Sequence, residues 1–279
     1  GALTIKGASA LTTLENNKTI TLDITEVSGT AVANEFTGAL TITTNDDDGG
    51  ADADVTIDGG TTKLIIATST IDGDLTIQTG NADDTSGITD SNTVTVGGNL
   101  SVTNDVTNGD IVMDSLAVTG TIALTTSGDG DATVKNNNGL TFAGTSVGDD
   151  LTAEASAGSI AQATGTILNI TGDTTLTAAN AQSINLNNGN IFTSQTVAFN
   201  ASGGGTLANV TISDTGGDAT TGRFDLAALT LASGGNLVVT AGGAVSDSGT
   251  LVIPGTTTIS AAGQDVALNS TNNNFTGAV

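Results

Sequence analysis

The feature that most constrains this chain is a three-residue unit that recurs along its length: an apolar residue, a small residue and a second apolar residue. Alternation with a period of two is typical of a β-strand that buries one face. Turn-forming Gly, Asn, Asp or Ser follows almost every unit, and no stretch shows a sustained 3.6-residue period with helix caps. The sequence therefore predicts many short strands and essentially no helix. Among these units are Leu3-Thr4-Ile5, Val55-Thr56-Ile57, Leu75-Thr76-Ile77, Val94-Thr95-Val96, Val210-Thr211-Ile212 and Leu251-Val252-Ile253.

Longer segments recur as well. The segment Gly-Gly-Asn-Leu-Ser-Val at 97–102 returns as Gly-Gly-Asn-Leu-Val-Val at 234–239, with looser copies at 72–77 and 148–153. Periods of roughly 20–30 residues built from short strands are typical of a solenoid. Near the C-terminus we expect equivalent strands about 21 residues apart, as a solenoid of this kind requires. The expected stacked pairs are Leu229 with Leu251, Leu237 with Ile259, and Val245 with Val266.

These repeats predict an all-β fold, a parallel β-helix (β-solenoid) with roughly 20–22 residues per coil. Inward side chains would stack on the same positions of the next coil, and β-branched residues suit such stacks. The alternative is a tandem pair of Ig-like or cadherin-like β-sandwiches, which need longer strands and usually an aromatic core. We expect residues 1–279 to form one solenoid segment with an irregular Asp-rich loop around 44–60.

The strands of type Gly-Asn/Asp-Leu-x-Val, separated by turns rich in Ala, Gly and Asn, resemble the shaft repeats of filamentous-haemagglutinin-type exoproteins. They are more distantly similar to repeats of giant bacterial surface adhesins. The segments Glu15-Asn16-Asn17-Lys18-Thr19-Ile20-Thr21-Leu22 and Gly263-Gln264-Asp265-Val266-Ala267-Leu268 have the same character. The resemblance implies a right-handed parallel β-helix, secretion, and a role as a stalk or adhesive fibre.

The two ends of the sequence together resemble one internal motif. The tail Asn-Phe-Thr-Gly-Ala-Val at 274–279 matches the first part of 34–42, and the head Gly-Ala-Leu-Thr-Ile at 1–5 matches its second part. No capping segment is recognisable, and a bare solenoid end exposes unpaired strand edges. We expect this segment to belong to a longer repeat array or a stacked filament, with chance similarity as the alternative.

Composition excludes several kinds of chemistry. The 279 residues include 29 Asp and Glu against 5 Lys and Arg, a net charge of -24, and no His, Cys, Trp or Tyr. Without His or Cys there is no Ser-His-Asp triad, thiol nucleophile, zinc site of the His/Cys type, haem or iron–sulfur cluster. The acidity argues against nucleic acid, whose phosphates it would repel, and against direct insertion into a membrane.

Clustered acidic residues in glycine-containing turns are the candidate metal ligands. Calcium prefers several oxygen ligands, and clustered Asp with turn carbonyls provides them. The competing explanation is that these carboxylates are solvated and keep the molecule soluble. We therefore expect either no cofactor or calcium. The candidate calcium ligands are Asp46, Asp47, Asp48, Asp52, Asp54, Asp129 and Asp131.

We expect a structural extracellular protein that forms a stiff β-helical rod: a fibre subunit, an adhesin shaft or a surface-layer element. The alternative is a ligand-binding adhesin module that uses the Asp-rich loops. Expected partners are a second copy or flanking repeats of the same chain, or host and matrix glycans or proteins. We do not expect an enzyme, because the five bases are scattered and the aromatic residues that favour sugar binding are scarce. These bases are Lys6, Lys18, Lys63, Lys135 and Arg223.

Overall fold

The computed structural model describes residues 3–23, 34–45, 49–82, 86–193, 196–215 and 223–279. The chain divides into two compact units, Gly1–Asn137 and Asn138–Val279, and each is considered by itself. Within the described residues the only helical element is a single 3₁₀ turn, η1 (Ser202–Gly204). None of the described segments is a helix with the length and hydropathy needed to cross a membrane.

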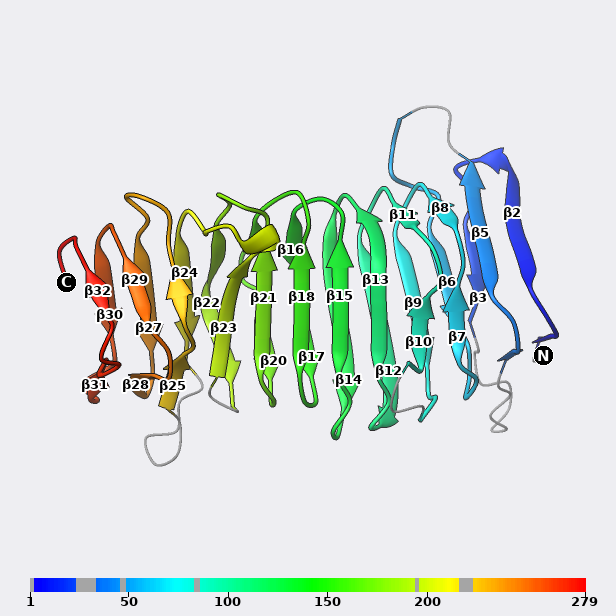
Figure 1. Ribbon diagram of the computed structural model, residues 1–279. Helices are drawn as coiled ribbons and strands as arrows, with labels where there is room; N and C mark the ends of the chain where they lie inside the picture. Colours follow the sequence, from blue (N-terminus) through cyan, green and yellow to red (C-terminus); the bar gives the residue numbers. More distant parts are fainter. Residues whose placement is uncertain (1–2, 24–33, 46–48, 83–85, 194–195, 216–222) are drawn as a thin grey trace. The chain divides into compact units, whose positions relative to one another are not determined.

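The first unit is a stack of short parallel strands, in which each strand bonds to its equivalent one coil later (Figure 1). On one face, for example, Leu75 of β9 pairs with Leu100 of β12, which pairs with Ile122 of β14. The described strands are β1 (Thr4–Ile5), β2 (Ser9–Asn16), β3 (Ile20–Leu22), β4 (Glu35–Phe36), β5 (Leu40–Asn45), β6 (Val55–Asp58), β7 (Leu64–Ile66), β8 (Ser69–Ile71), β9 (Leu75–Thr79), β10 (Ile88–Asp90), β11 (Val94–Val96), β12 (Leu100–Thr107), β13 (Ile111–Val118), β14 (Thr121–Ser127) and β15 (Ala132–Asn136).

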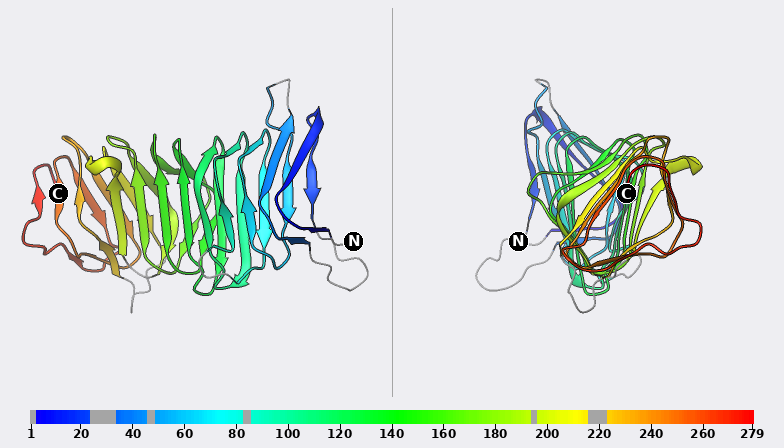
Figure 2. Two further views of the ribbon diagram at one scale, coloured as in Figure 1. Left: turned by 45° about the vertical axis from the view of Figure 1, so that its right-hand side comes forward. Right: turned by 90° about the vertical axis from the view of Figure 1, so that its left-hand side faces the viewer.

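The second unit has the same construction, and the end-on view in Figure 2 shows its coils winding around a common interior. On one face Ile184 pairs with Val210, which pairs with Leu237. Its described strands are β16 (Leu140–Phe142), β17 (Thr145–Val147), β18 (Leu151–Ala155), β19 (Ile160–Gln162), β20 (Leu168–Ile170), β21 (Thr174–Ala178), β22 (Ile184–Phe192), β23 (Thr196–Ala201), β24 (Val210–Asp214), β25 (Arg223–Leu226), β26 (Leu229–Thr230), β27 (Leu237–Ala241), β28 (Ala244–Asp247), β29 (Leu251–Ile253), β30 (Thr257–Ser260), β31 (Val266–Ala267) and β32 (Asn274–Phe275).

Both units are therefore β-solenoids, as the alternation predicts, and the β-sandwich alternative is wrong because the strands pair in parallel. In the coils away from the two ends, the two apolar residues of each unit of the pattern point inward and are almost completely buried, whereas Leu3 and Val266 near the ends are exposed. Each buried Leu, Ile or Val contributes about 1.5–3 kcal/mol to folding, so a row that repeats in every coil supplies most of the stability. Two such rows in the first unit are Leu75, Leu100 and Ile122, and beside it Ile77, Val102 and Leu124.

The predicted stacking near the C-terminus is correct at two of three positions. Leu229 pairs with Leu251, and Val245 pairs with Val266. The third prediction, Leu237 with Ile259, is wrong by two residues, because Leu237 pairs with Thr257 and Val239 pairs with Ile259. Thr257 is buried at an inward position that the apolar pattern alone does not mark.

Coil length also varies more than the sequence predicts. Leu140 pairs with Ile160, 20 residues later, whereas Val210 pairs with Leu237, 27 residues later. Both of these strand pairs keep one register along their length, so the difference in coil length arises outside them. Turns tolerate insertions because their length has little effect on the free energy of closing a loop.

Candidate functional site

Asp and Asn side chains at one corner of the first unit form a ladder that runs from coil to coil. Oδ1 of Asp54 accepts a hydrogen bond from the backbone N–H of Asp74 at 2.8 Å. Oδ1 of Asp74 accepts one from the N–H of Asn99 at 2.7 Å, and Oδ1 of Asn99 accepts one from the N–H of Thr121 at 2.9 Å. Each of these residues directly precedes an inward aliphatic residue, so the ladder fixes the start of each strand against the coil before it.

The ladder explains why glycine precedes these residues. A Cβ added at Gly73, Gly98 or Gly120 would lie closer than 3.0 Å to the side-chain oxygen of the preceding ladder residue. Contacts that short do not occur without a shift of the neighbouring atoms. The recurring Gly-Asn/Asp-Leu motif is therefore a structural unit: glycine leaves room for the carboxylate or amide of one coil, and the next residue donates to it.

The second unit carries the same ladder. Oδ1 of Asp150 accepts from the N–H of Asp173 at 2.7 Å. Oδ1 of Asn209 accepts from the N–H of Asn236 at 3.0 Å, and Oδ1 of Asn236 accepts from the N–H of Thr256 at 2.7 Å. Carboxylate and amide serve the same purpose here, since both offer an oxygen acceptor.

Buried asparagines form a further set of contacts that the sequence pattern does not reveal. The Asn136 amide accepts from the N–H of Val118 at 2.9 Å and donates to its carbonyl at 3.0 Å. In the second unit, Oδ1 of Asn190 accepts from the N–H of Leu168 at 2.9 Å. A primary amide can thus replace a strand residue in bonding the neighbouring coil. The signal in the sequence would be an Asn at an inward position of the alternation.

Of the predicted calcium ligands, the four that the structure describes take part in coil-to-coil bonding and do not gather into one cluster. Besides the Asp54 contact, the N–H of Asp52 donates to Oδ2 of Asp72 at 3.2 Å. The N–H of Asp129 donates to Asn108 and that of Asp131 donates to Asp110, both at 2.8 Å. Within the ranges that the structure describes, no group of three or more Asp or Glu side chains is arranged to hold a metal ion. Asp46, Asp47 and Asp48 lie outside the described residues.

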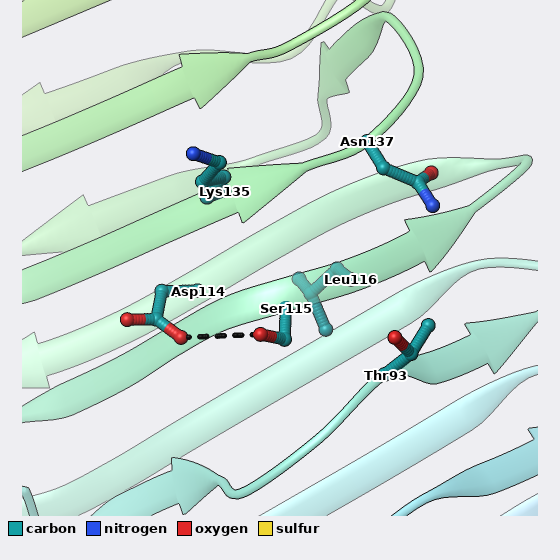
Figure 3. Close-up of a pocket in the computed structure, with 6 residues that line it drawn as sticks. All are labelled: Thr93, Asp114, Ser115, Leu116, Lys135 and Asn137. Carbon is teal, nitrogen blue, oxygen red and sulfur yellow. Dashed lines mark hydrogen bonds between the residues drawn. The ribbon is translucent and has the colours of Figure 1, made fainter.

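A polar hollow of about 210 Å³ lies on the first unit, at a corner where the connecting segment becomes shorter by one residue in each of two successive coils (Figure 3). Three residues separate the end of β10 at Asp90 from the start of β11 at Val94. Two residues, Asp114 and Ser115, lie in the irregular part of β13 between Met113 and Leu116, whereas β15 has only Lys135 at that place. The step between successive coils leaves the hollow. Its lining residues are Thr93, Asp114, Ser115, Leu116, Lys135 and Asn137.

The chemistry of this hollow is that of a small polar recess. Lys135 supplies an ammonium, Asp114 a carboxylate, and Ser115 and Thr93 supply hydroxyls; Ser115 Oγ donates to Asp114 Oδ1 at 3.4 Å. Ligand sites usually have volumes of about 300 Å³ or more, so the recess suits water or a very small polar molecule.

Asp90 bonds to the backbone of two residues that line this recess, and only 8% of its surface is exposed. Its Oδ2 accepts from the N–H of Ser115 at 2.8 Å, and its Oδ1 accepts from the N–H of Asp114 at 3.2 Å. Burial, supported by the Asp114 carboxylate and partly offset by these two hydrogen bonds, raises the pKa of Asp90 from 3.8 to about 6. The Asp90 carboxylate thus accepts hydrogen bonds from the Asp114 and Ser115 amides, although burial and the nearby Asp114 charge disfavour its ionised form.

Parallel coils, stacked aliphatic rows and Asn/Asp ladders define a β-solenoid repeat protein. Two stretches, residues 129–199 and 208–279, match the family described as repeats of unknown function (DUF5649). They cover just over half of the chain, which therefore belongs to this family. No curated protein matches the chain. No solved structure matches it either.

Proposed function

We propose that this chain is a structural protein, a β-solenoid segment that acts as a stiff extracellular shaft, fibre subunit or surface-layer element. The observation that carries the proposal is the bonding between coils. Backbone hydrogen bonds, aliphatic rows and the Asn/Asp ladder all join the same pairs of successive coils. Most of the recurring residues of the sequence therefore make contacts between coils, and such contacts are what a load-bearing shaft needs.

Stiffness follows from the way these contacts add. In a solenoid each repeat contacts its neighbours, and stability is approximately a sum over neighbouring interfaces. Bending would stretch backbone hydrogen bonds on one side and separate packed side chains within the interior. A solenoid lengthens without changing its cross-section, so the number of coils sets the length of the shaft.

An extracellular position and self-partnering belong to the same proposal. A net charge of -24 keeps such shafts apart laterally at moderate salt. The resemblance to exoprotein and adhesin shaft repeats supports secretion, and the partners we propose are flanking repeats of the same kind or a second copy.

A second candidate, a ligand-binding adhesin module loaded with calcium, draws on one observation. Asp52 and Asp54 lie on one coil and Asp72 and Asp74 on the next, and hydrogen bonds from a backbone N–H to a carboxylate join them, so acidic residues of two coils meet at one corner. A cation bound at this corner would take oxygen ligands from these carboxylates and from the turn carbonyls.

One experiment separates the two candidates. The purified chain is imaged by negative-stain electron microscopy and followed by analytical ultracentrifugation, with calcium and with excess chelator. A structural shaft gives elongated particles and the same sedimentation in both conditions. Compact particles contradict the shaft. A chelator-dependent change of sedimentation, with calcium binding by calorimetry that Asp74→Asn weakens, favours the second candidate.

A further inference from the structure

Two aspartates in the two units end a strand in the same way but have different neighbours. Asp90 ends β10 and accepts from the adjacent amides of Asp114 and Ser115. Asp247 ends β28 and accepts from the adjacent amides of Asn269, at 2.8 Å, and Ser270, at 3.4 Å. Each is 8% exposed. The pair therefore provides a matched comparison within one chain.

The third neighbour differs. At the second corner, the side-chain amide of Asn273 donates to Oδ2 of Asp247 at 2.6 Å. At the first corner that neighbour is Asp114, a carboxylate that can donate nothing when ionised. Burial acts to raise the pKa of Asp247, but the hydrogen bonds from Asn273, Asn269 and Ser270 outweigh it and leave the pKa below its ordinary value. Burial and Asp114 together raise the pKa of Asp90.

Among the described residues, few charged groups lie on the strands packed against Asp90. On the preceding coil, β7 offers Leu64, Ile65 and Ile66, of which Ile66 pairs with Asp90, and the adjacent Lys63 bonds to Ser86. On the following coil, β13 offers Asp114, and Lys135 of β15 lines the same recess as Asp114. The strand after the corner, β11, carries no charged residue. Asp114 is thus the titratable partner that bears directly on Asp90.

We propose that Asp90 and Asp114 form a proton-binding pair that tightens this corner of the solenoid when the surroundings become mildly acidic. Above neutral pH the buried carboxylate of Asp90 holds the amides of Asp114 and Ser115 while facing a second negative charge. Uptake of one proton removes the repulsion, and the resulting Asp90 O–H can donate to the Asp114 carboxylate. The Asp114–Ser115 irregularity then resists local opening more strongly. The Asp247 corner, which already has an amide donor, does not respond in this pH range.

The proposal goes beyond the structural role and is tested on the whole chain by amide hydrogen exchange, followed by NMR at about pH 5 and about pH 7.5. After correction for intrinsic exchange rates, protection of the Asp114 and Ser115 amides should rise several-fold at the lower pH, with about tenfold as the upper bound. Protection of Asn269 and Ser270 should stay constant. Asp114→Asn should reduce the rise, and Asp90→Asn should abolish it.

Three results overturn the proposal. One is an Asp90 carboxyl carbon that titrates near its ordinary value. The second is equal pH dependence at both corners, which would indicate a global change. The third is a rise that persists in Asp114→Asn at full size. The carboxyl titration and Asp114→Asn decide the matter even if Asp90→Asn does not fold.

Discussion

The corners at Asp90 and Asp247 show that the backbone arrangement alone does not set the pKa of a buried aspartate. Both aspartates expose the same small fraction of their surface, both end a strand, and both accept from two consecutive amides about one coil further on. Their pKa values nevertheless move in opposite directions. Burial is the largest cause of the raised pKa of Asp90, and the Asp114 carboxylate acts in the same direction, whereas the hydrogen bonds from Asn273, Asn269 and Ser270 outweigh burial at Asp247. A repeating scaffold thus supplies the same acceptor geometry many times, and burial together with the neighbouring side chains sets the response to protons.

The largest effect is expected from substitutions in the buried rows beside the two corners, and it shows whether these rows contribute equally to stability. Leu116→Ala, beside the Asp90 corner, and Leu251→Ala, beside the Asp247 corner, should each lower the free energy of unfolding by about 2–5 kcal/mol. Both leucines are at most 1% exposed, and each substitution leaves a cavity in a stacked row. Urea denaturation followed by circular dichroism measures the loss. A loss below about 1 kcal/mol at one corner would show that its row collapses around the missing atoms.

Removing each carboxylate should have unequal consequences. Asp247→Ala leaves the amides of Asn269 and Ser270 and the Asn273 side chain without their acceptor, and we expect a loss of about 1–3 kcal/mol near neutral pH. Asp90→Ala also leaves two amides unpaired, but it removes a desolvated charge that faces Asp114. Its loss should therefore be smaller. Equal losses in parallel urea titrations would contradict the contrast between the corners.

Exchanging the third neighbours sharpens the comparison. Asn273→Asp should raise the pKa of Asp247, and Asp114→Asn should lower that of Asp90, although only in part because burial is the larger cause. A raised carboxyl pKa in the folded state gives stability that is complete below the unfolded value and lost as pH rises through the folded value. The native Asp90 corner should therefore lose stability between about pH 4 and about pH 6.

The native Asp247 corner has the opposite sign. A lowered pKa gives stability that is present above the unfolded value of 3.8 and lost only as pH falls below it. Denaturation midpoints at several pH values should show Asn273→Asp acquiring a decline toward neutral pH that the native corner lacks. A profile for Asn273→Asp that matches the native protein would show that Asn273 does not set the Asp247 response.

Sequence alone is sufficient for part of this structure. Period-two alternation and recurrence near 21 residues predict parallel stacked strands, because stacked coils bury the apolar residues of successive units against one another. The register of Thr257 and the variable coil length are not predictable, since a buried Thr and an extended turn leave no mark in hydropathy. The Gly-Asn/Asp-Leu motif is visible in the sequence, but its role as a coil-to-coil ladder depends on which residue lies one coil earlier.

The candidate sites were harder to predict for the same reason. Asp52, Asp54, Asp129 and Asp131 stand in acidic segments near glycines, as calcium ligands often do. In a solenoid, the same spacing places backbone amides against side-chain oxygens. Asp90 stands in no acidic cluster of the sequence, and its partner Asp114 is 24 residues away. Pairs of this kind become visible only when the coil length is known at that point of the chain.

The smallest expected effect belongs to outward residues, and it sets the scale for the others. Thr76→Ala in β9 and Thr240→Ala in β27 replace exposed side chains at positions that alternate with the buried rows. Each should change the free energy of unfolding by no more than about 0.5 kcal/mol, because no buried contact is lost. Neither change should alter the pH dependence of unfolding, as neither residue bears on an ionisable group at the two corners. If either substitution shifted the pH profile as Asp114→Asn is expected to, the profile would report global charge and not the Asp90–Asp114 pair.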